Sequence, residues 1–146
     1  MLEVVAFVHL TATAAMVGLI WFVQVVHYPL FGAVGERSFV AYEDRHRFRT
    51  GLVVGPLMGA ETGSAAVLAV FGSGAVRAAA VGGLVLLAAI HASTVLVQVP
   101  LHMALSEAHD PARIARLVRT NWVRTVLWTT RLVPAAIALR ALPGGS

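Results

Sequence analysis

The sequence contains no cysteine and no lysine, and only 12% of its 146 residues are charged. Without cysteine, the chain cannot form disulfides, thiolate metal sites or thiol nucleophiles. A soluble domain carries about 25% charged residues, roughly twice the value found here. This low charge, together with 58% hydrophobic residues and a mean hydropathy of +0.80, is typical of an integral membrane protein.

All eleven basic residues are arginines, and the sequence pI is near 11.1. A basic pI can indicate nucleic-acid binding. Most of these arginines, however, cluster at the edges of apolar runs, where anionic lipid head groups would meet them. We therefore expect the lipid bilayer to be a partner of this chain and expect no nucleic acid.

Four apolar runs of about 20 residues each match the ~30 Å hydrocarbon core of a bilayer. They predict membrane-spanning helices at residues 4–26, 50–71, 78–103 and 121–139. The predicted fold class is all-α, a four-transmembrane-helix bundle that forms one integral membrane domain over residues 1–146. Ala12-Thr13-Ala14 resembles a signal-peptidase site, but no basic residue precedes it and the apolar run continues past it. We therefore expect the first span to remain uncleaved.

The distribution of arginine predicts an orientation. The first and third connections contain seven arginines: Arg37, Arg45, Arg47, Arg49, Arg113, Arg116 and Arg119. The opposite side has only Arg77 and Arg140. The positive-inside rule places both long connections in the cytoplasm and both termini outside, in the inner (cell) membrane of a bacterium. Asp110-Pro111 is a good helix start, so short interfacial helices are expected on the cytoplasmic side.

The two halves of the chain share features that are consistent with an internal duplication. Arg49 precedes Glu61 by twelve residues, and Arg119 precedes Arg131 by the same number. Val-Gln-Val occurs near the end of both the first and the third span, with a histidine and a proline close behind. One interpretation is two similar hairpins packed about an axis along the membrane normal.

Ionisable residues inside the spans mark the candidate site. At ~1.5 Å per residue, Arg131 lies about 13 Å and Glu61 about 15 Å from the outer face, with His91 and Arg124 deeper. An ionisable residue within a bilayer is costly and indicates a function or a partner. We therefore predict that His91, Glu61, Arg131 and Arg124 are catalytic. The alternative is that Glu61 and Arg131 form a buried ion pair that only fixes helix register.

One chemistry that fits is a metal site near the cytoplasmic face. Glu43-x-x-His46 places a carboxylate and an imidazole one turn apart, as in di-iron bundles. His27 and His102 end the first and third spans at a similar depth. Since imidazole and carboxylate together suit iron, copper or zinc, these four residues are the predicted metal ligands.

The other chemistry is a metal-free pocket for a flat, lipophilic substrate. Arg131 and Arg124 would hold a phenolate or carboxylate, and His91 would act as a general base. Other residues at these depths complete the predicted substrate pocket: Gln24, Gln98, Asn121 and Trp128. Hydrogen bonding and packing within the bundle are the alternative roles for all of them.

The third span ends in VLVQVPLHMAL, and NWVRTVLW opens the fourth. This pattern resembles the anthrone-oxygenase-like family of small four-helix membrane proteins, in which Val-x-x-Pro precedes a polar segment and Asn/His-x-x-Arg-Thr. The matching positions are Val97, Pro100, Asn121, Arg124 and Thr125. Some members oxygenate polyketide anthrones to anthraquinones, so the resemblance implies a similar activity here. The chain more loosely resembles four-helix haem proteins of the protoporphyrinogen-oxidase type.

The sequence therefore favours a membrane-embedded oxidoreductase or oxygenase that acts on a lipophilic aromatic or quinone-like substrate in a polar pocket within the bundle. A non-enzymatic carrier or channel for a small anion or lipophile, and a structural membrane protein, remain open as alternatives. The cofactor is open as well: iron, copper, haem with His91 or His9 as axial ligand, or none. A lipophilic small molecule is the expected partner. So small a bundle is also expected to form a homo-oligomer.

Overall fold

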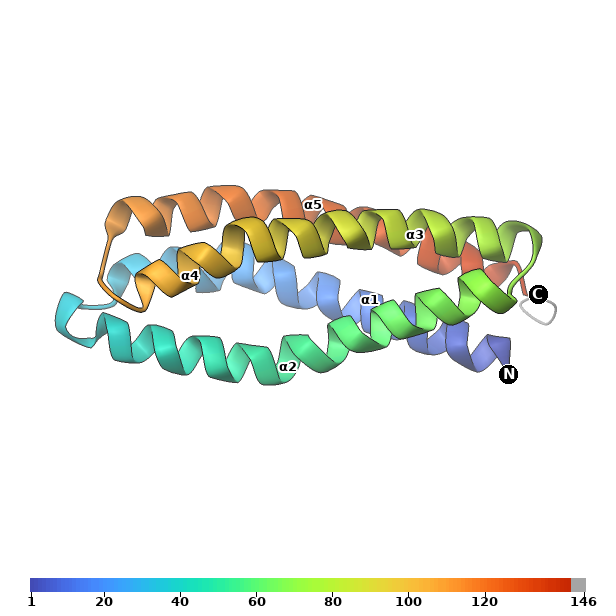
Figure 1. The fold of residues 1–146 in the computed structure, drawn as a ribbon, viewed down its shortest axis with the longest axis horizontal. Coiled ribbons are helices and arrows are strands. Elements are labelled where there is room, and N and C mark those ends of the chain that lie inside the picture. The colour runs from blue at the N-terminus through green and yellow to red at the C-terminus, as the bar shows by residue number, and fades with distance from the viewer. Residues whose placement is uncertain (143–146) are drawn as a thin grey trace.

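The computed structural model describes residues 1–142 as an all-helical protein, and within these residues no strand occurs. The predicted all-α fold class is therefore confirmed. The elements are α1 (Leu2–Phe22), η1 (Val23–His27), η2 (Pro29–Ala33), α2 (Glu36–Phe71), α3 (Gly74–Ser93), η3 (Thr94–Gln98), α4 (Val99–Leu105) and α5 (Pro111–Arg140). They join end to end into four long rods, which run up and down along one axis (Figure 1).

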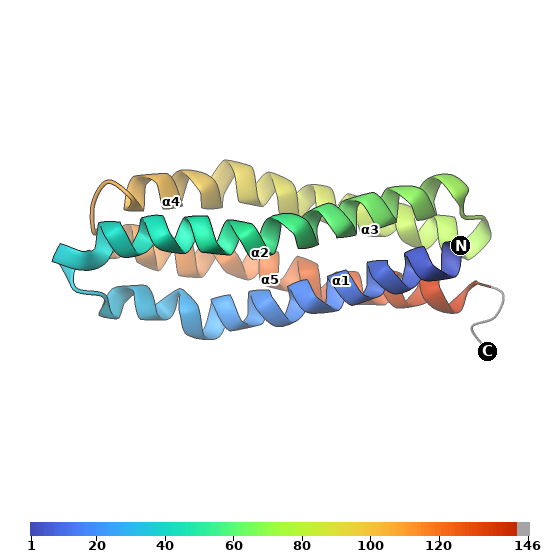
Figure 2. The ribbon, with the colours of Figure 1, turned by 90° about the horizontal axis from the view of Figure 1, so that it is seen from below.

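The four rods form a closed bundle in which consecutive rods are neighbours. α1 packs against α2 and α5, and α3 packs against the same two helices. α2 and α5 therefore lie on one diagonal of the bundle, and α1 and α3 on the other, an arrangement that can be followed in Figures 1 and 2. The N-terminus, the α2–α3 turn and the end of α5 share one end of the bundle (Figure 1). This up-and-down topology needs only short connections.

Three of the four rods are long and apolar enough to cross a membrane: Leu2–Ala33, Glu36–Phe71 and Gly74–Leu105. Large apolar side chains are also exposed on the outside of the bundle, among them Phe7, Leu52, Leu96 and Val126. α5 lacks comparable hydropathy, because its 30 residues contain several arginines. The fourth predicted span thus remains a prediction.

The predicted interfacial helices do not exist as separate elements. α2 is continuous over 36 residues, about 54 Å at ~1.5 Å per residue, and α5 begins directly after Asp110. The Asp110 carboxylate accepts hydrogen bonds from the backbone N–H groups of Ala112 and Arg113, which caps the helix as predicted. No helix-breaking residue lies between the predicted interfacial segments and the spans that follow them. Each segment therefore forms one continuous helix with its span. The bundle is consequently longer than a ~30 Å hydrocarbon core.

Two π-helical turns interrupt the rods at matching places, η1 before Pro29 and η3 before Pro100. A proline has no N–H to bond the carbonyl four residues earlier, and those carbonyls, on Val25 and Leu96, fall inside the π-turns. The sequence predicted that the first span would end at residue 26. The helical chain continues beyond that residue, because the π-turn and a short 3-10 helix extend the rod to Ala33. The matching π-turns agree with the proposed duplication.

Candidate functional site

Glu61 and Arg131 form an ion pair in the centre of the bundle, and both side chains are fully buried. Arg131 Nη1 donates to Glu61 Oε1, and Arg131 Nε donates to the Gly83 carbonyl oxygen at 3.2 Å. The second carboxylate oxygen of Glu61 accepts from Trp128 Nε1 at 3.0 Å. Every oxygen of the carboxylate is thus occupied. This arrangement satisfies the buried carboxylate and leaves no ligand atom of Glu61 free, whereas Arg131 Nη2 has no hydrogen-bond partner within residues 1–142.

A hydrogen-bonded network of neutral groups lies between the central ion pair and the end of the bundle opposite the termini. Gln24 Nε2 donates to the Val118 carbonyl oxygen at 3.1 Å, and Gln24 Oε1 accepts from Asn121 Nδ2 at 2.9 Å. Thr125 Oγ1 donates to the same oxygen at 3.4 Å. These bonds tie η1 to α5. Gln24 and Asn121 therefore help to hold η1 against α5.

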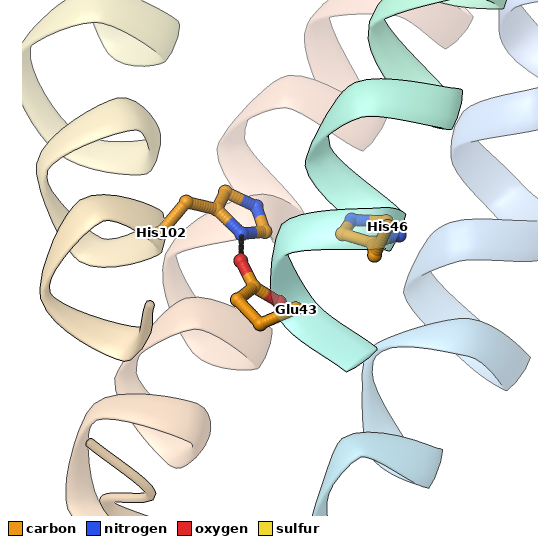
Figure 3. A group of neighbouring side chains, drawn as sticks. All are labelled: Glu43, His46 and His102. Atoms are coloured by element: carbon orange, nitrogen blue, oxygen red, sulfur yellow. Dashed lines mark hydrogen bonds and ion pairs between the residues drawn. The ribbon is translucent and has the colours of Figure 1, made fainter. Parts of the chain in front are cut away.

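Three side chains converge near the end of the bundle opposite the termini: Glu43 and His46 from α2, and His102 from α4 (Figure 3). One ligand atom from each lies within 4.8 Å of the others. His102 Nδ1 is 2.5 Å from Glu43 Oε1, the contact drawn as a dashed line in Figure 3. Helical spacing explains the pair on α2, because residues three apart occupy the same face. We call Glu43, His46 and His102 the carboxylate–histidine cluster.

Neighbouring groups orient the histidines of this cluster. His27 Nε2 is 2.8 Å from His46 Nδ1, and Thr50 Oγ1 is 3.1 Å from the same nitrogen. The Tyr28 hydroxyl is 2.9 Å from His102 Nε2. Metal-ligating histidines usually bond through the other ring nitrogen to a fixed partner, which sets the tautomer and the ring orientation. Both cluster histidines have such partners.

The cluster also has an unused ligand atom. Glu43 is fully buried, and its Oε2 has no hydrogen-bond partner within residues 1–142. Ligand atoms around one metal ion, with bonds of about 2.0–2.2 Å, lie roughly 3–3.5 Å apart, and those of the three side chains all lie within 4.8 Å of one another. Two histidines and one carboxylate are the donor set of the mononuclear iron(II) oxygenase sites. The residues therefore fit a first-row metal ion.

Two pockets open on either side of His46. One, of about 550 Å³, lies between α1 and α2 and is lined by Phe22, His27 and His46 with Arg45 and Arg49. The other, of about 230 Å³, lies between α2 and the α3–α4 rod. Its polar lining comes from Tyr28, His46, Thr50, Thr94, Gln98, His102 and Arg124, with Arg47 beside them. We call them the α1–α2 pocket and the α2–α4 pocket. A ligand in either pocket would contact the cluster.

The structure brings most of the predicted site residues together, in two separate groups. Glu61, Arg131 and Trp128 form the central group. Three of the four predicted metal ligands, Glu43, His46 and His102, meet at one end of the bundle. The fourth, His27, is not part of that group and lies beside it, hydrogen-bonded to His46. The predicted pocket residues Gln24, Gln98, Asn121 and Arg124 lie at the same end. His91 belongs to neither group: it lies on α3, half-buried, and its Nε2 has no hydrogen-bond partner in the described part of the chain. His91 therefore makes no hydrogen bond to Glu61, Arg124 or Arg131 in this part of the chain.

Sequence reasoning missed Tyr28 and Thr50 as members of the site. Tyr28 follows His27 and precedes Pro29, where a helix end was expected, so its side chain had no predicted direction. Thr50 lies four residues after His46 on α2, one helical turn away. That spacing was visible in the sequence and could have identified Thr50.

Comparison with known proteins adds no identification. No protein-family model, curated protein or solved structure matches this chain.

Proposed function

We propose that this protein is a membrane-embedded, metal-dependent oxidoreductase that acts on a lipophilic aromatic or quinone-like substrate. The observation that carries the proposal is the convergence of Glu43, His46 and His102 from two rods, beside two pockets. The apolar outer surface of three rods supports a site inside a bilayer, where such a substrate would dissolve. The resemblance to anthrone oxygenases points to the same substrate class.

Iron is the metal that the donor set favours, because two imidazoles and one carboxylate leave positions open for further ligands. When bound, the iron would supply activation of dioxygen. The chain's own residues would hold it and shape the reaction space: Thr50 and His27 fix the His46 ring, and Tyr28 fixes the His102 ring. The oxidation of an anthrone-type CH₂ group by O₂ to a ketone and water balances without another reductant.

Substrate access fits the α1–α2 pocket. Its wall includes Leu19, Phe22 and Val53, which suit an aromatic or aliphatic body, and His27 and His46 form its polar end. The Phe22 ring stacks on His27 at a centroid distance of 6.2 Å. Arg45 and Arg49 line the same pocket, where they would meet a polar or anionic substituent. A lipophile would enter sideways from the bilayer, in contact with the apolar wall.

Metal analysis of purified protein tests the proposal. Protein purified in mild detergent and reconstituted anaerobically with iron(II) should retain close to one iron per chain. His46→Ala, His102→Ala and Glu43→Ala should each lower that content sharply, because tight binding needs three ligands. His91→Ala is the matched control, since His91 lies outside the cluster, and should keep its iron. Retention of no first-row metal, or equal loss in the His91 variant, would contradict the proposal.

A further inference from the structure

α5 carries two buried arginines, Arg124 and Arg131, seven residues apart and so on nearly the same helix face. They differ in one respect. Arg131 pairs with the Glu61 carboxylate, whereas no acidic side chain within residues 1–142 forms an ion pair with Arg124. A buried charge without a counter-ion is unfavourable, and Arg124 lacks the counter-ion that Arg131 has in Glu61.

The surroundings of Arg124 hold its guanidinium in place without neutralising it. Arg124 is 7% exposed, and its Nη1 donates to Asn121 Oδ1 at 3.3 Å. Its guanidinium carbon lies 5.2 Å from the centre of the Trp128 ring, within cation–π distance. Asn121 is held in turn by Gln24, and Trp128 by Glu61. Arg124 Nε has no hydrogen-bond partner among the described residues, which leaves a buried donor free.

The Arg124 side chain lines the α2–α4 pocket together with Tyr28, His46 and His102. A ligand in this pocket would contact the free cation and the cluster histidines at once. If the proposed divalent metal is bound, its two positive charges and that of Arg124 face only the single negative charge of Glu43. The pocket then has an excess of positive charge, which favours an anionic ligand.

We infer that Arg124 is the anion-binding residue of the site and that it binds the carboxylate or phenolate oxygen of an acidic aromatic substrate in the α2–α4 pocket. The inference rests on the proposed function in placing the substrate at the carboxylate–histidine cluster, and it assigns the acidic group of that substrate to Arg124 in the α2–α4 pocket and not to Arg45 and Arg49. It narrows the substrate class from lipophilic aromatics in general to those that carry an ionised oxygen. Arginine suits this role because its guanidinium offers paired, charge-assisted hydrogen bonds.

A matched pair of probes tests the inference: 2-naphthoate and 2-naphthamide, which have nearly the same shape and differ in charge. Binding is measured by calorimetry in a non-ionic detergent, on protein stripped of metal with a chelator. The wild-type chain should bind naphthoate about tenfold or more tightly than naphthamide, as expected for a charged hydrogen-bond pair. Arg124→Gln should abolish this preference and leave naphthamide affinity unchanged. Arg119→Gln, on the exposed face of the same helix, should retain it.

Three results would overturn the inference: no preference in the wild-type chain, a preference that survives in Arg124→Gln, or displacement of naphthoate by phosphatidylglycerol, which would assign the site to a lipid head group. If Arg124→Gln does not fold, Arg124→Lys keeps the charge but loses the paired donors, and its preference for naphthoate should fall below that of the wild-type chain without vanishing. Because binding is measured without metal, a failed metal site does not affect this test. Arg124→Gln should in turn bind iron normally.

Discussion

Glu61 and Arg131 form an ion pair across the diagonal of the bundle, between α2 and α5, two helices that do not pack directly against each other. The pair therefore spans the centre of the protein. Trp128 and the Gly83 carbonyl add hydrogen bonds to it, while Arg131 Nη2 has no hydrogen-bond partner among the described residues. A buried pair of this kind costs desolvation of both ions, so its main effect is to fix which faces of the helices turn inward.

The diagonal pair predicts strong coupling between its two members. Glu61→Gln would leave Arg131 as a buried cation without a counter-ion, and Arg131→Met would leave the Glu61 carboxylate in the same condition. Each single change should destabilise the fold by about 3 kcal/mol or more. The double variant removes both charges together and should be clearly less harmful than the sum of the singles. Thermal unfolding of the four proteins in detergent measures the coupling, and additive effects would show that the residues do not act as partners.

Tyr28 should tune the metal affinity of the cluster through its hydrogen bond to His102. Tyr28→Phe removes the hydroxyl and keeps the ring, so His102 loses the partner that fixes its orientation. Loss of such a partner typically lowers metal affinity by about 10- to 100-fold. Competition with a calibrated chelator measures the change. Tyr42→Phe is the control, because Tyr42 lies nearby in the α1–α2 pocket and, in the described structure, makes no hydrogen bond to a cluster histidine. Equal affinities in wild type and Tyr28→Phe would refute this role.

The ion pair and the cluster could be predicted from the sequence because both depend on depth. Depth follows from the rise per residue, and it brought Glu61 to the level of Arg131. For the cluster, the Glu43-x-x-His46 spacing supplied two members, and the depth of His102 supplied the third. Depth also placed His91 among the candidate residues, but depth does not determine which way a helix face turns, because that follows from packing. The sequence does not indicate how each helix is rotated about its own axis. It therefore could not show that Arg131 forms an ion pair and that Arg124 does not.

The π-turns are a second reason why the rotation could not be predicted. A π-turn holds one residue more than an α-turn, so it changes the phase of every later side chain in the same rod. In a regular helix over residues 78–103, Gln98 and His102 would lie on the same face as His91, but η3 interrupts that regularity. The structure instead turns Gln98 toward Thr120 and His102 toward Glu43.

This phase change predicts the result of a deletion. Val95 lies in η3 and is 62% exposed, so its side chain is not part of the site. Deleting Val95 should convert η3 to regular α-helix, and because the π-turn holds one extra residue, the later side chains should keep their orientation and His102 should still face Glu43. The variant should therefore retain bound iron, as should Val95→Ala, which keeps the residue count. Loss of iron in a folded deletion variant would show that the extra residue of η3 is needed to position His102.

The orientation of the bundle in its membrane is the last prediction, and the absence of cysteine makes it simple to measure. The arginine-rich end, which holds the start of α2 and of α5, should face the cytoplasm, and the α2–α3 turn should face outward. Ser73→Cys and Glu107→Cys each place one exposed thiol at opposite ends of the bundle. A membrane-impermeant maleimide added to intact cells should label Ser73→Cys at once and Glu107→Cys only after lysis. The reverse pattern would place the carboxylate–histidine cluster and both pockets at the outer face, and the substrate would then be one supplied from outside the cell.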